Sequence, residues 1–125
     1  MQYGYKKQVN LPFAETEKRI REELAKEGFG IITEINVKET FKKKLDVDFE
    51  NYIILGACHP ASAYKILQAD KEMGLLLPCN VLVYEDKGSV YVSTVLPKAL
   101  IAAIGKDLEI AREIEDKLKK VIDAV

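Results

Sequence analysis

A continuous apolar run at positions 52–57, Tyr-Ile-Ile-Leu-Gly-Ala, limits the folds open to this chain more than any other feature. The run is too short for a core helix, and it predicts a strand buried on both faces. Cys58 and His59 follow it, and Pro60 suits the first turn of a helix that continues to about Ala69. The centre of the chain therefore predicts a buried strand that leads directly into a helix.

The segments on either side change repeatedly between a period of two, typical of strands, and a helical period. Alternation predicts a strand at 2–9, and β-branched and aromatic residues predict another at 29–37. The other predicted elements are a helix from Pro12 that stops at Gly28, a short helix or loop at 39–45, a helix from Pro97 through Ile104, and a last helix from about Asp107.

The most secure predicted hairpin joins residues 79–84 to residues 89–95. Both segments alternate around the loop Glu85-Asp86-Lys87-Gly88. An aspartate followed two residues later by glycine suits a short loop in which the glycine takes a positive φ.

The last helix carries an apolar stripe, and its other faces are charged. The stripe must cover an apolar surface, and the sheet is the first candidate, with a partner subunit second. Its members recur at spacings of three and four: Ala111, Ile114, Leu118, Val121 and Val125.

The order of elements predicts an α+β fold with a mostly antiparallel sheet and helices packed largely on one face. The 125 residues contain no repeat, low-complexity tract or linker-like run, so residues 1–125 are predicted to form a single domain.

Charge and hydropathy bear on partners and location. The chain has 19 basic and 20 acidic residues, so no long-range field attracts nucleic acid, and no nucleic-acid partner is expected. No segment approaches the roughly 20 apolar residues of a membrane span, and no signal-like apolar region follows Met1. We therefore expect a cytoplasmic protein whose two cysteines are free thiols.

The candidate site gathers both cysteines, the only histidine and two of the four prolines. It comprises Cys58, His59, Pro60, Pro78, Cys79 and Asn80.

Cys58 has two interpretations. At the amino end of a helix its pKa would fall, which favours a reactive thiolate. Free cysteine is equally often a small buried hydrophobe. A catalytic Cys58–His59 pair is disfavoured because adjacent residues of a strand point to opposite faces, so a capping role suits His59 better. Asn80 could fix a ligand or, more simply, satisfy backbone groups.

The two cysteines are too far apart in sequence for a C-x-x-C redox loop or a zinc ribbon. If their strands were neighbours, Cys58, Cys79 and His59 could supply three ligands for zinc or copper. No metal or cofactor is predicted, and any catalytic residue stays unknown.

Two strings of residues, 52–60 and 74–81, resemble the bacterial and archaeal domain-of-unknown-function 302 family. Gly28-Phe29-Gly30, Thr33-Glu34-Ile35 and Ala63 also fit its pattern, so the likeness covers nearly the whole chain. The resemblance implies a compact α+β fold laid out like half of the TATA-box-binding protein, and a homodimer. It implies neither DNA binding nor an activity.

The chain departs from the family pattern at two positions. His59 stands where relatives usually carry asparagine, and Leu96 where they usually carry aspartate. A general role for imidazole chemistry at position 59 is therefore disfavoured. The leading hypothesis is a homodimeric binding module with a site for a small ligand or a thiol or sulfur species around Cys58 and Cys79. The alternatives are a thiol redox or metal-binding protein, and an interaction domain whose cysteines are inert.

Overall fold

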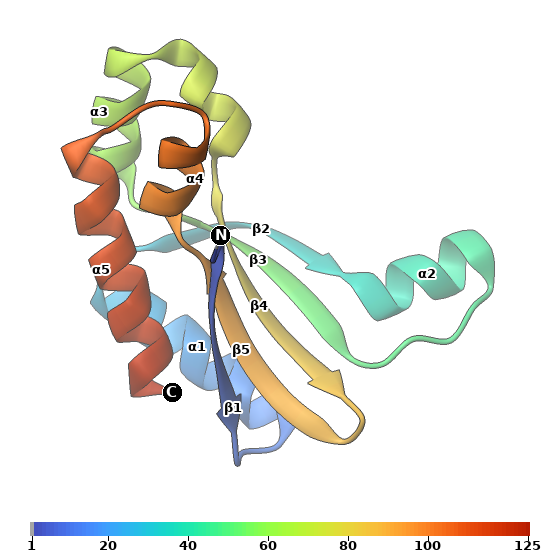
Figure 1. The fold of residues 1–125 in the computed structure, drawn as a ribbon. Coiled ribbons are helices and arrows are strands. Elements are labelled where there is room, and N and C mark those ends of the chain that lie inside the picture. The colour runs from blue at the N-terminus through green and yellow to red at the C-terminus, as the bar shows by residue number, and fades with distance from the viewer. Residues whose placement is uncertain (1) are drawn as a thin grey trace.

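A computed structural model describes residues 2–125, which form a five-stranded sheet with helices gathered on one face (Figure 1). Helices α1 and α5 lie across that face, and α3 and α4 pack against α5 at one end. The elements in chain order are β1 (Gly4–Val9), α1 (Phe13–Lys26), β2 (Gly30–Asn36), α2 (Val37–Leu45), β3 (Tyr52–Cys58), α3 (Pro60–Ala69), the 3-10 helix η1 (Lys71–Leu76), β4 (Cys79–Asp86), β5 (Ser89–Val95), α4 (Pro97–Ala103) and α5 (Glu109–Ala124).

The strand order is β1-β5-β4-β3-β2, and every neighbouring pair is antiparallel. This confirms the predicted α+β class. The predicted hairpin is confirmed as β4–β5, and its loop residues Lys87 and Gly88 have φ values of 51° and 84°. Two consecutive positive φ angles are typical of the tight two-residue loops whose twist matches that of the flanking strands.

The core lies between the sheet and its helices. Alternate residues of β3, here Ile53, Leu55 and Ala57, are buried beneath the helices. Tyr52 and Ile54 point to the other face and are only half-buried, because no helix covers them. The prediction that this strand is buried on both faces was therefore wrong for its first half. A run of apolar residues does not show which face of the strand is covered by helices and which is open.

The stripe of α5 packs inside the molecule. Ala111, Ile114, Leu118 and Val121 are each buried within the single chain, against the sheet and α1. The first interpretation of the stripe is confirmed, and its use as a subunit contact was wrong because the sheet already occupies it.

Helix α2 projects from the body of the molecule as an arm, formed by residues 37–49 (Figure 1). It confirms the helical alternative for this segment, and the Asn36 side chain caps it by accepting a hydrogen bond from the Glu39 N–H at 3.0 Å. No residue of α2 is buried. None of the helices within residues 2–125 combines the length and apolar character that a membrane span requires.

Candidate functional site

The end of β3 and the start of β4 bring the two cysteine segments together. Ala57 is the direct partner of Cys79 in the antiparallel ladder, and Cys58 is the partner of Gly30 in β2. Because side chains alternate along a strand, Ala57 and Cys79 share the helix-covered face, and alternation assigns Cys58 to the other. The two segments are neighbours, yet the two cysteines do not form a facing pair.

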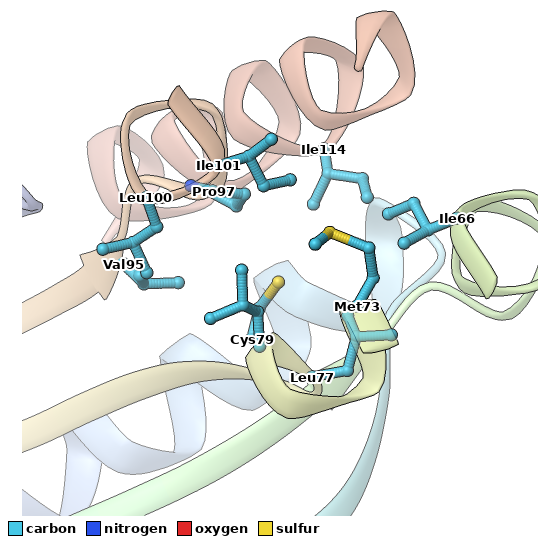
Figure 2. Close-up of a pocket in the computed structure, with 10 residues that line it drawn as sticks. Ile66, Met73, Leu77, Cys79, Val95, Pro97, Leu100, Ile101 and Ile114 are labelled. Atoms are coloured by element: carbon cyan, nitrogen blue, oxygen red, sulfur yellow. The ribbon is translucent and has the colours of Figure 1, made fainter. Parts of the chain in front are cut away.

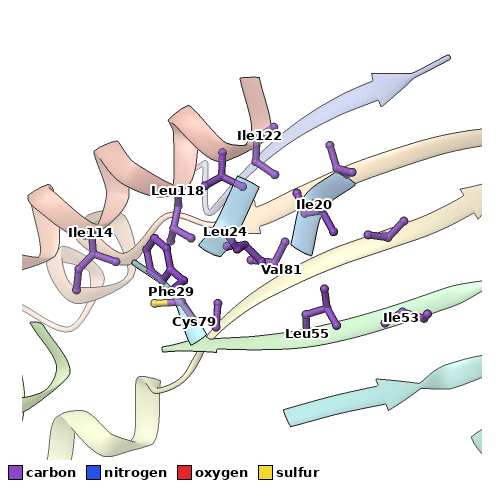
Figure 3. Close-up of a cluster of buried hydrophobic side chains, with 14 of the residues drawn as sticks. Ile20, Leu24, Phe29, Ile53, Leu55, Cys79, Val81, Ile114, Leu118 and Ile122 are labelled. Carbon is purple, nitrogen blue, oxygen red and sulfur yellow. The ribbon is translucent and has the colours of Figure 1, made fainter. Parts of the chain in front are cut away.

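Cys79 is buried in the same core cluster as Phe29 and Leu24 (Figure 3). Burial raises the pKa of its thiol from 9.0 to about 11, and the nearby Cys58 adds to this shift. At neutral pH Cys79 is therefore a protonated thiol, a weak hydrogen-bond donor on an otherwise apolar wall.

Cys58 is half-buried and is also a free cysteine. It ends β3 immediately before α3, as predicted. The residue at the helix N-cap is His59, so Cys58 lies one position outside the first turn. A thiolate at Cys58 stays a prediction.

The imidazole of His59 is held by residues other than the cysteines. Its Nδ1 is hydrogen-bonded to the buried Ser62 Oγ at 2.9 Å, and its ring meets the Phe29 ring edge-on with centroids 5.4 Å apart. The ring makes no capping hydrogen bond. Within residues 2–125, no cluster of three or more His, Cys, Asp or Glu side chains could hold a metal ion.

The two prolines have different roles. Pro60 begins α3 at the position that needs no N–H donor. Pro78 follows a cis peptide bond after Leu77, and its ring lies over Gly56: a Cβ on Gly56 would stand 2.8 Å from Pro78 Cγ and still closer to Thr33 Oγ1. Gly56 thus allows β2 and the residue before β4 to meet above β3.

Asn80 is exposed on β4. Its backbone carbonyl accepts a hydrogen bond from Thr94 Oγ1 at 3.4 Å. Within the described part of the chain, the Asn80 side chain takes part in none of the hydrogen bonds, and its amide is exposed to solvent.

An apolar cavity of about 20 Å³ lies directly against Cys79. The sulfur atoms of Cys79 and Met73 both point toward its centre (Figure 2). Six structural elements supply the wall: α3, η1, β4, β5, α4 and α5. The lining residues are Ile66, Met73, Leu76, Leu77, Cys79, Val95, Pro97, Leu100, Ile101 and Ile114.

A surface groove of about 250 Å³ adjoins this cavity. Groove and cavity share four lining residues, and the groove adds Leu75, Pro78 and Asn80. Of the sequence-predicted site residues, the structure brings Pro78, Cys79 and Asn80 to this cavity and groove. Cys58, His59 and Pro60 line neither of them.

An ion pair fastens the segments that carry the cavity wall. Lys106, in the loop after α4, pairs with Asp70, the residue before η1. Asp70 also accepts a hydrogen bond from the Glu72 N–H at 2.9 Å, which caps η1. The hydrogen bond from Lys106, and then that from Glu72, lower the pKa of the Asp70 carboxyl.

Sequence reasoning missed most of the cavity wall. Met73, Ile101 and Ile114 come from three elements that are distant in sequence, so no local pattern joins them to Cys79. The one usable signal was the apolar run Leu75-Leu76-Leu77 before Pro78, two of whose members line the cavity.

Comparison with known proteins gives a family and a structural relative. A family model described as "Domain of unknown function DUF302" matches residues 5–125. The crystal structure of an uncharacterized conserved DUF302 protein from Bacillus stearothermophilus is similar, with 30% sequence identity and a TM-score of 0.92 over 99% of this chain and 98% of that one. A search of curated proteins found no match.

Proposed function

The chain belongs to the DUF302 family, and from that premise we propose that it is a small binding module whose ligand occupies the apolar cavity beside Cys79. The observation that carries this proposal is the cavity itself. Its lining residues are all apolar apart from the Cys79 thiol, and two sulfur atoms point into it. Well-packed protein cores contain few cavities of this kind, so a cavity at this position supports a binding role.

The chemistry of the wall selects the ligand. No charged side chain lines the cavity, and an uncompensated charge there would be costly, so the ligand is neutral. Polarizable sulfur atoms favour soft partners. A volume of about 20 Å³ accepts a group of about one or two heavy atoms without rearrangement. The matching class is a neutral sulfur species, hydrogen sulfide or a short alkanethiol.

The adjoining groove offers the entry route, since Leu76, Leu77, Val95 and Leu100 border both spaces. Exchange of a ligand then requires these side chains to move, while the sheet stays in place. The redox alternative has less support: Cys79 faces the core as a protonated thiol, and strand alternation assigns Cys58 to the opposite face.

Methanethiol titration, followed by the methyl NMR signal of Met73, tests this proposal. We expect a saturable shift of that signal with methanethiol and none with methanol, whose hydroxyl the wall cannot pair. Cys79→Met fills the space and should abolish the shift. If methanethiol leaves the Met73 signal and the melting temperature unchanged, the cavity is inert core and the proposal is wrong.

A matched pair of variants separates binding from general loosening. Ile101→Val enlarges the cavity, whereas Ile122→Val removes the same methylene from a core position outside its lining. Both should cost roughly 1 kcal/mol of stability. Only Ile101→Val should improve the affinity for ethanethiol relative to methanethiol. Equal effects of the two variants would contradict binding at this cavity.

We propose further that the protein is a homodimer in which the arm formed by residues 37–49 contacts the second copy. Support comes from the apolar side chains that the arm leaves uncovered: Leu45 is 66% exposed, and Val47 and Phe49 are exposed beside it. An isolated nine-residue helix is marginal in water, so cover from a partner would stabilise it.

Light scattering tests the dimer against the 14.1 kDa mass of one chain. We expect twice that mass, and a shift toward the monomer for Leu45→Asp. Leu75→Asp is the matched control, because Leu75 is 82% exposed but lies at η1. A monomeric wild-type protein at high concentration would overturn this part of the proposal.

A cytoplasmic location is part of the same proposal. Both cysteines are free, which suits a compartment that keeps thiols reduced. Cell fractionation with thiol trapping tests this location. Recovery of the protein from a compartment that oxidises thiols would contradict it.

A further inference from the structure

Three tyrosines form a row across the open face of the sheet, the face without helices. Tyr84 in β4 is the direct partner of both Tyr52 in β3 and Tyr91 in β5. Their rings are stacked, with centroids 5.2 and 5.4 Å apart and interplanar angles of 21° and 23°. Such cross-strand aromatic pairs order one another's side chains.

Both ends of the row are occupied. The Phe49 ring lies 6.1 Å from that of Tyr52, and Lys6 Nζ lies 5.2 Å from the centre of the Tyr91 ring. The faces of the tyrosine rings are therefore already used, and a nucleobase has no free ring face between them. What remains available is the flank of the row.

That flank borders a groove of about 340 Å³, a size that suits a small organic molecule. Tyr52 and Tyr84 form one side, and the amino-terminal segment at Gln2 and Tyr3 also lines it. The complete lining is Gln2, Tyr3, Gly4, Lys6, Tyr52, Leu82, Tyr84 and Ser93.

The polar groups of the groove define the charge of its occupant. Lys6 is its one cation, and among residues 2–125 Lys6 takes part in none of the ion pairs. Burial, and then the neighbouring Tyr84, raise the pKa of Tyr52, so its hydroxyl stays protonated at neutral pH. Ser93 adds an aliphatic hydroxyl to those of the lining tyrosines. Aromatic walls, hydroxyl donors and one ammonium that has an aromatic ring but, among the described residues, no carboxylate as its neighbour together suit an anion with an apolar ring.

We infer that this groove is a binding site for an aromatic monocarboxylate. The ring of the ligand packs against the flank of Tyr52 and Tyr84 over Leu82, and its carboxylate pairs with Lys6. A phosphate is a poorer match, because the lining contains neither an arginine fork nor a helix amino end. The site is separate from the cavity at Cys79: the two share no lining residue.

NMR titration with 2-naphthoate tests the inference, read at the Leu82 and Ser93 amides. We expect a saturable shift with naphthoate and weaker binding of both 2-naphthylmethanol and 2-naphthyl phosphate. The shifts should persist in Cys79→Met, so failure here and failure of the cavity proposal are distinguishable. No saturable shift at millimolar naphthoate, or tighter binding of the alcohol or the phosphate, would overturn the inference.

Two variants check the contacts. Lys6→Gln should weaken naphthoate binding about threefold, the effect of one exposed ion pair, and leave the alcohol unaffected. Tyr84→Leu should weaken both ligands. Lys18→Gln is the matched control, since Lys18 is an exposed lysine on α1, which packs on the other face of the sheet. Unchanged naphthoate affinity in Lys6→Gln would overturn the inference.

Discussion

The imidazole of His59 lies directly against Gly28: a Cβ on Gly28 would stand only 3.1 Å from Nε2. Gly28 has a φ of 84° where α1 ends, and its N–H is hydrogen-bonded to the Ala25 carbonyl at 3.1 Å. The end of α1 and the start of α3, separated in sequence by β2, α2 and β3, therefore meet at a glycine and a histidine.

Gly28→Ala should destabilise the protein more than Gly88→Ala. Both glycines have a φ of 84°, so both substitutions carry the cost of a side chain in the left-handed region. Nothing lies within 4 Å of a Cβ at Gly88. We expect the difference in free energy of unfolding to be about 1 kcal/mol, as for mild overpacking, measured by urea denaturation. His59→Ala should remove that difference, and its persistence would contradict the contact.

Gly56→Ala should cost about 2 kcal/mol of stability, because its methyl group would collide with Thr33 and Pro78. Gly30→Ala is the control on the adjacent strand, where a Cβ meets nothing within 4 Å, and it should be neutral or slightly stabilising. Thr33→Ala should partly rescue the Gly56 variant. Calorimetry of the wild type, Gly56→Ala, Gly30→Ala and the double variant Gly56→Ala/Thr33→Ala measures these effects. Equal melting temperatures for Gly56→Ala and Gly30→Ala would refute the close approach.

The thiol of Cys79 should make stability depend on pH in the alkaline range. Its folded-state pKa of about 11 lies above the ordinary value of 9.0. The stabilising contribution is thus complete below pH 9 and is lost as pH rises toward 11, when only the unfolded state releases the proton freely. We expect wild type to lose up to about 2 kcal/mol more than Cys79→Ala over this range. Parallel curves for the two proteins would show that the thiol is not desolvated.

Lys106→Met should raise the pKa of the Asp70 carboxyl toward the ordinary aspartate range, because Lys106 is the main cause of its lowering. In wild type the carboxylate contributes stability above the ordinary aspartate pKa, and this is lost as pH falls through the lower folded-state value. Carboxyl NMR titration measures the shift. Lys71→Met, at an exposed lysine next to Asp70, should leave that titration nearly unchanged; an equal response would mean that no specific pair forms.

The order of elements could be predicted because its signals are local. Pro60 and Pro97 begin helices, and Gly28 and Gly88 take the positive φ expected where a helix ends or a hairpin turns. The 3-10 helix η1 was missed. Its capping residue, Asp70, is a local signal, but the six residues that follow are too few to show a helical period.

The candidate site could be predicted only in part. The sequence shows that Cys58 precedes a helix and that Cys79 opens a strand. It does not show that Ala57, the residue before Cys58, is the strand partner of Cys79. The pairing register of two strands is set along the whole of β3 and β4. The partner of His59, Ser62, lies three positions along the same chain and could have been recognised as a neighbour at the helix start.

The tyrosine row gives the open face of the sheet a spectroscopic signal of its own. The chain contains six tyrosines and no tryptophan, so no indole signal hides the phenol absorption. Half of these chromophores stand stacked as Tyr52, Tyr84 and Tyr91, close enough for their electronic transitions to couple. Near-ultraviolet circular dichroism of the unlabelled protein therefore includes a contribution from this surface, and a molecule or second chain that disturbs the stacking should change the spectrum.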